Sequence, residues 1–176
     1  MKALLAAGLA LFAATPAAAQ TEALLECATS TVTPAFRERL TDSMLGDGGK
    51  GGGAEAMFQE LARVSSDCAD RNSLADGKRD ALFSYNVARL PHDTLIVRLG
   101  DRGLSAQVID QALDFGTGRS NPVIKGDLDQ AQLAALLARL KASGVNVDKV
   151  TDPTWEMIGA YAAATSLMWQ ARRELQ

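Results

Sequence analysis

The two cysteines of this chain, Cys27 and Cys68, stand on either side of a glycine-rich run over residues 46–53. Each falls on the apolar side of a helical pattern, with Leu24 before the first and Leu61 before the second. In an oxidising compartment, two cysteines in one chain most simply form a disulfide. Closing a loop of about 40 residues stabilises a fold by about 4 kcal/mol in the chain-entropy model. We therefore expect a disulfide that joins two helices across a flexible loop; two free or metal-binding thiols are the alternative.

The N-terminus has the pattern of a secretory signal peptide. Lys2 precedes a short apolar run, and Ala17 and Ala19 supply the small residues that signal peptidase requires. The apolar run is shorter than the roughly 20 residues needed to cross a bilayer. We expect a cleaved signal peptide over residues 1–19, one helical domain over 20–176 with no later membrane span, and a periplasmic or secreted location in a bacterium.

Composition favours helices and argues against nucleic-acid binding. The 176 residues carry 18 basic and 21 acidic side chains, a net charge of −3, without the basic stripe that binding phosphates requires. Aromatic residues make up 5% of the chain and alanine is abundant, which favours close-packed helices. The sequence predicts an all-α, single-domain bundle of about five or six helices around a central helix over residues 155–169. Close approach of neighbouring helices is expected at its small residues, Gly159, Ala160, Ala163 and Ala164.

Two boundaries in the middle of the chain are predicted from proline and capping signals. Pro91 is expected to end a helix, because proline lacks the backbone N–H that a helix interior uses. The stretch 93–99 after it can be a helix or a strand; we favour a helix, since the sequence offers no second strand to pair with it. Asp127 and Gln130 have the spacing of a capping box that opens a later helix.

Motifs for nucleotides, metals and haem are missing from the sequence. Gly49 and Lys50 resemble part of a P-loop, but a glycine follows the lysine where Ser or Thr is required. With one histidine in the chain and no CxxCH motif, neither a usual zinc site nor covalent haem attachment is expected. Haem held by His92 and a methionine is the remaining cofactor alternative, and core packing is the better interpretation of the methionines. We therefore predict no cofactor, no metal site and no catalytic residue.

Polar side chains concentrate around the single histidine. His92, Asp93, Arg98 and Arg102 follow one another closely, and a histidine beside a carboxylate invites comparison with a hydrolytic triad. Sequence adjacency does not supply the nucleophile, and no GxSxG motif is present. These four residues form a speculative polar site.

The function that this pattern favours is that of a small exported protein that binds another envelope or secreted protein without catalysis. One alternative is an envelope-acting hydrolase that uses His92 and Asp93. Another is a periplasmic stress chaperone, which would expose apolar helix faces at low pH. The sequence predicts no specific partner and no oligomeric state.

Overall fold

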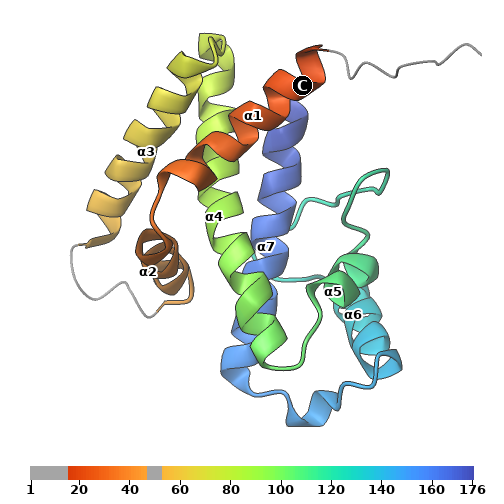
Figure 1. The fold of residues 1–176 in the computed structure, drawn as a ribbon. Helices are drawn as coiled ribbons and strands as arrows, with labels where there is room; N and C mark the ends of the chain where they lie inside the picture. The colour runs from red at the N-terminus through yellow and green to blue at the C-terminus, as the bar shows by residue number, and fades with distance from the viewer. Residues whose placement is uncertain (1–15, 47–52) are drawn as a thin grey trace, which may run out of the picture.

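The computed structural model describes residues 16–46 and 53–176, and its regular structure there is entirely helical (Figure 1). The all-α prediction is thus confirmed, with seven α-helices in the described residues where we expected about five or six. They are α1 (Pro16–Thr31), α2 (Pro34–Met44), α3 (Gly53–Arg71), α4 (Arg79–Asp101), α5 (Ala106–Leu113), α6 (Gln130–Ala142) and α7 (Asp152–Leu175), with 3-10 turns η1 (Asp76–Lys78) and η2 (Val147–Lys149). The predicted signal peptide and the predicted loop over 46–53 lie mostly outside the described residues.

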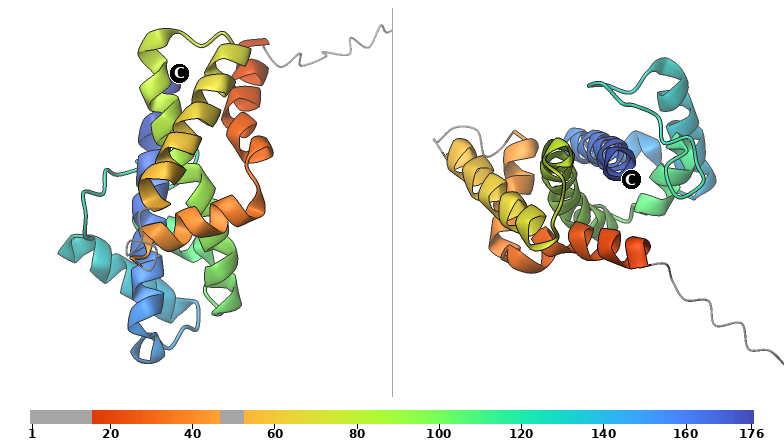
Figure 2. Two further views of the ribbon diagram at one scale, coloured as in Figure 1. Left: turned by 90° about the vertical axis from the view of Figure 1, so that its left-hand side faces the viewer. Right: turned by 90° about the horizontal axis from the view of Figure 1, so that it is seen from above.

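Two long helices, α4 and α7, lie side by side and form the axis of the molecule (Figures 1 and 2). Helices α1, α2 and α3 pack on one side of this pair, and α5 and α6 lie on the other. The prediction that α7 is the central helix needs correction. It is α4 that packs against α1, α2, α3, α5 and α7, whereas α7 packs mainly on α4 and to a smaller extent on α5.

Pro91 lies inside α4, so the predicted helix end at this residue is wrong. The missing N–H removes one backbone hydrogen bond, and proline in a helix interior costs about 3 kcal/mol. Tertiary packing offsets that cost: Leu90, Pro91 and Leu95 are all buried as the helix passes from one part of the core to the next. The stretch 93–99 is therefore a continuation of the same helix, in line with the helix that we favoured for it.

The apolar core consists of two clusters that share α4 and α7. One cluster gathers α1, α2, α3, the first half of α4 and the end of α7, with Phe36, Leu61 and Leu82 fully buried or nearly so. The other gathers the second half of α4 with α5, α6 and the first half of α7 around Leu99 and Ile109. Polar side chains that include His92 and Tyr161 lie where the two clusters meet.

The predicted disulfide is present and joins α1 to α3. The Cα atoms of Cys27 and Cys68 are 5.8 Å apart across a sequence separation of 41 residues, and Cys68 is completely buried. The bond therefore fixes two helices that do not follow each other directly in the chain. None of the described helices has an apolar stretch long enough to span a membrane.

Helix α6 begins with a capping box, two residues later than the spacing of Asp127 and Gln130 predicted. The side chain of Asp129 accepts from the backbone N–H of Gln132, and the Gln132 side chain accepts from the backbone N–H of Asp129. This reciprocal pair satisfies two donors at the helix start. Asp127 is thereby left in the preceding loop, where its carboxylate faces solvent.

Candidate functional site

His92 lies at the junction of α4 and α7 and is 8% exposed. Its Nδ1 is 3.1 Å from Oδ1 of Asp93, so the ring donates a hydrogen bond to that carboxylate. The face of the imidazole stacks on Tyr161 of α7, with ring centroids 5.0 Å apart and an interplanar angle of 23°. The structure thus brings His92 and Asp93 into contact and adds Tyr161, which the sequence did not single out.

Asp93 is held as a carboxylate by two neighbours on α4. Burial opposes its ionisation, but the hydrogen bond from His92 and the positive charge of Arg89 outweigh that effect, and the pKa of Asp93 lies below its usual value. Arg89 Nε donates to Asp93 Oδ2 at 2.9 Å, and Arg89 also lies 3.6 Å from a carboxylate oxygen of Glu26 on α1. We call Glu26, Arg89, His92 and Asp93, with Tyr161 and Asp110, the His92 network.

Tyr161 links the His92 network to α5. Its hydroxyl donates to Oδ1 of Asp110 at 2.8 Å. Desolvation raises the pKa of the Tyr161 phenol, and the nearby Asp110 carboxylate raises it further, so the phenol stays protonated as the donor. Desolvation also raises the pKa of Asp110 above its usual value, against the opposing effect of this hydrogen bond. The network therefore connects α1, α4, α5 and α7 through paired polar groups.

Arg98 and Arg102 take no part in these contacts. Arg98 pairs with Glu38 and Asp42 of α2, and Arg102 donates a hydrogen bond to the sulfur of Met157. Each residue of an α-helix turns the side-chain direction by about 100°. The four predicted polar residues are close together in the sequence, but their side chains therefore extend from several sides of α4.

The His92 network consists of polar contacts that connect helices inside the protein. The contacts of the imidazole are with a carboxylate and an aromatic ring, and no hydroxyl or thiol nucleophile bonds to it among the described residues. A histidine-based hydrolase needs a nucleophile on the second ring nitrogen. The described part of the chain likewise contains no group of three or more His, Cys, Asp or Glu side chains placed to hold a metal ion.

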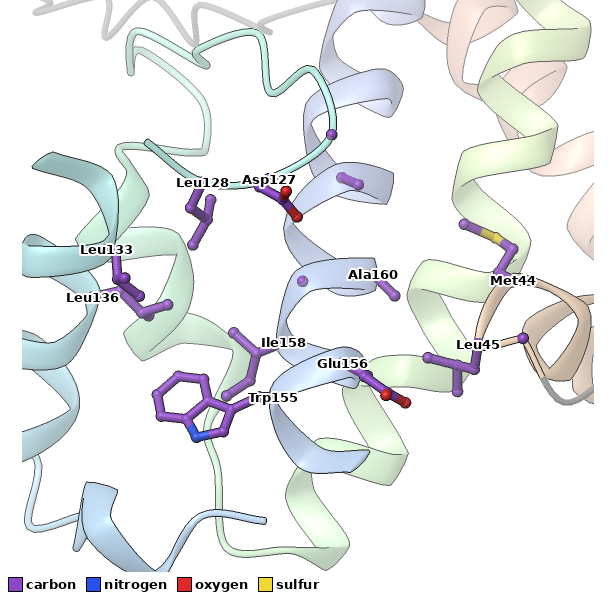
Figure 3. Close-up of a pocket in the computed structure, with 14 residues that line it drawn as sticks. Met44, Leu45, Asp127, Leu128, Leu133, Leu136, Trp155, Glu156, Ile158 and Ala160 are labelled. Carbon is purple, nitrogen blue, oxygen red and sulfur yellow. The ribbon is translucent and has the colours of Figure 1, made fainter. Parts of the chain in front are cut away.

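A second feature is an apolar groove of about 820 Å³ whose floor is the solvent-facing side of α7 (Figure 3). Met44 and Leu45 at the end of α2 form one wall. Leu128 in the loop before α6, with Leu133 on α6, forms the other. We call this feature the α7 groove. Leu133 is 42% exposed and Met44 is 37% exposed, so both walls present apolar side chains to solvent.

The floor of the α7 groove is made of small residues. Gly159 is exposed, and a Cβ atom added to it would meet no other atom within 4 Å. Ala160 and Ala163 continue the floor along the helix. The sequence predicted close approach of neighbouring helices at these positions, and at Gly159 that prediction is wrong, because this residue is exposed and no described helix covers it. Ala164, predicted with them, points the other way and is 2% exposed.

In the part of the chain that the structure describes, two carboxylates are the charged side chains that line the α7 groove. Figure 3 shows Asp127 beside the upper part of the groove and Glu156 at its lower end, with Ala160 between them. Neither residue forms an ion pair with another described residue of the chain. The groove therefore combines an apolar surface with negative charge near its ends.

Sequence reasoning did not find the α7 groove, because its parts come from three separate segments around residues 44–46, 126–136 and 155–163. The glycine and alanines of α7 were the available signal.

The sequence matches no protein-family model, and comparison with curated proteins and with solved structures yields no match either.

Proposed function

We propose that this chain is a non-catalytic binding protein of the bacterial envelope, exported by its N-terminal signal peptide, that holds an α-helical segment of another exported protein in the α7 groove. The observation that carries the proposal is the uncovered apolar floor at Gly159. A partner that covers this floor and the exposed side chains of Met44 and Leu133 would remove apolar surface from water, which favours association.

A helix fits the shape of the α7 groove better than a small molecule does. Small-molecule sites enclose most of the ligand surface, whereas this groove is open along one side. An amphipathic helix placed in the groove would bury its apolar face and leave its polar face in water, as in the helix-in-groove mode of recognition. The small side chains of Gly159 and Ala163 would allow its backbone to approach α7 closely.

The hydrolase alternative receives less support from the geometry than the binding function does. His92 is almost fully buried, and its described contacts hold helices together rather than present a reacting group. The α7 groove, by contrast, offers open surface with no internal occupant among the described helices.

The test is a selection of amphipathic helices from a displayed peptide library, followed by titration calorimetry with a selected peptide. Gly159→Leu should fill the groove floor and weaken binding at least about tenfold, the equivalent of about 1.4 kcal/mol. Gly100→Leu is the matched control, because Gly100 is also an exposed helical glycine with no atom near its added Cβ, but it lies outside the groove. Equal affinity of the parent protein and Gly159→Leu, or no selected peptide at all, would overturn the proposal.

A further inference from the structure

We infer that the helix held in the α7 groove carries two basic residues, about two helical turns apart on its groove-facing side, that pair with Glu156 and Asp127. This inference rests on the proposed function and adds the chemistry of the partner to it.

The described lining of the α7 groove carries negative charge. Among the described residues, the other side chains that line the α7 groove are apolar or are glycine, so Glu156 and Asp127 supply the charge of this described lining. Two arginines line the neighbouring hollow that shares Leu45 and Glu156, and both have other partners: Arg98 pairs with two carboxylates of α2, and Arg102 donates to the sulfur of Met157. Neither arginine lies within ion-pair distance of Glu156. A basic partner is therefore the complementary one.

Covering the carboxylates of Glu156 and Asp127 with a partner removes their contact with water. A helix laid in the groove removes water from Glu156 and Asp127, and a carboxylate that loses water without gaining a donor is costly. Lysine or arginine on the incoming helix supplies the donors, and its alkyl stem can lie along the apolar walls. An acidic helix would place like charges together, and this repulsion disfavours it as a partner.

The positions of Glu156 and Asp127 along the groove set the spacing of the basic residues on the partner. The α7 residues that line the groove run from Trp155 to Ala163. From Glu156 to Ala163 the helix rises about 10 Å, at about 1.5 Å per residue. In Figure 3 Glu156 and Asp127 lie on opposite sides of Ala160 along this floor. Residues seven apart on a helix span the same length and share one face. The partner should therefore have basic residues at positions i and i+7, with small or apolar residues at i+3 and i+4 between them.

The inference can be tested with three synthetic helices of equal length that share one apolar face. The first has lysines at i and i+7 on that face, the second has glutamates there, and the third has the lysines on the opposite face. Titration calorimetry should show the first binding about tenfold or more tightly than either of the others. Raising the salt concentration should reduce that preference, because exposed ion pairs are screened.

Variants of the protein separate this inference from the proposed function. Glu156→Gln and Asp127→Asn should each reduce the preference for the first peptide, whereas Glu174→Gln, an exposed α7 carboxylate outside the groove, should leave it unchanged. If all three peptides bind equally and Gly159→Leu abolishes their binding, the charge inference is wrong and the groove function stands. If none of the peptides binds while a library-selected helix does, the charge pattern is again refuted. If no helix of any kind binds, both are overturned.

Discussion

Gly159→Leu should lose helix binding and yet give a more stable protein. Gly159 is in the interior of the 24-residue helix α7, in an ordinary helical conformation, with open space where a side chain would extend. Glycine at such a position costs about 0.5–1 kcal/mol relative to alanine, and leucine is nearly as good a helix former. For a chain of this size that gain corresponds to a rise of about 1–4 °C in Tm.

The assay is thermal and urea unfolding followed by circular dichroism at the α-helix band. Gly100→Leu provides the comparison and should gain less, because Gly100 lies in the last turn of α4, where helices fray. A fall in the Tm of Gly159→Leu would show that the space above Gly159 is already filled. That result would refute the reasoning, since loss of binding could then come from damage to the fold.

Three further predictions concern the scaffold that holds the groove. Replacing Cys27 and Cys68 by serine should lower the free energy of unfolding by about 4 kcal/mol for a 41-residue separation; an unchanged urea midpoint would contradict the role of the disulfide. Asp93→Asn should destabilise the protein at pH 7 by roughly 1–3 kcal/mol. Because the folded pKa of Asp93 is below its usual value of 3.8, this contribution is present above pH 3.8 and is lost as the pH falls through the lower folded pKa; a difference from the parent protein that stays constant down to pH 2 would refute it. Tyr161→Phe should cost about 1–2 kcal/mol, because it removes the donor from the partly buried Asp110 carboxylate. A double-mutant cycle with Asp110→Asn measures the coupling, which should be absent if the hydrogen bond contributes nothing.

Much of the fold could be predicted because its helices carry local signals. Thr33 and Pro34 mark the start of α2, and in the structure the Thr33 side chain accepts from a backbone N–H of the first turn. Periodicity placed both cysteines on the apolar sides of their helices. The disulfide was predicted from that placement together with the oxidising compartment that the signal-peptide pattern indicates. Pro91 shows the limit of such signals, because burial on both sides of it overrides the local preference for a helix end.

The candidate sites were less predictable, since they depend on how helices rotate and pack against one another. His92 and Asp93 are neighbours in sequence and in space, but the partners that define their surroundings, Tyr161 and Asp110, come from distant helices. The small residues of α7 indicated a place for close approach. Whether a helix of the same chain would cover them could not be inferred from local pattern.

The central claim, that a helix occupies the α7 groove, is tested most directly by the two tryptophan indole resonances in a ¹⁵N correlation spectrum. Trp155 lines the groove, whereas Trp169 lies further along α7 beside Arg172 and outside it. Adding a helix selected from the displayed library should shift the Trp155 indole signal and leave that of Trp169 in place. A shift of Trp169 alone, or no shift of Trp155 at a saturating peptide concentration, would contradict the account.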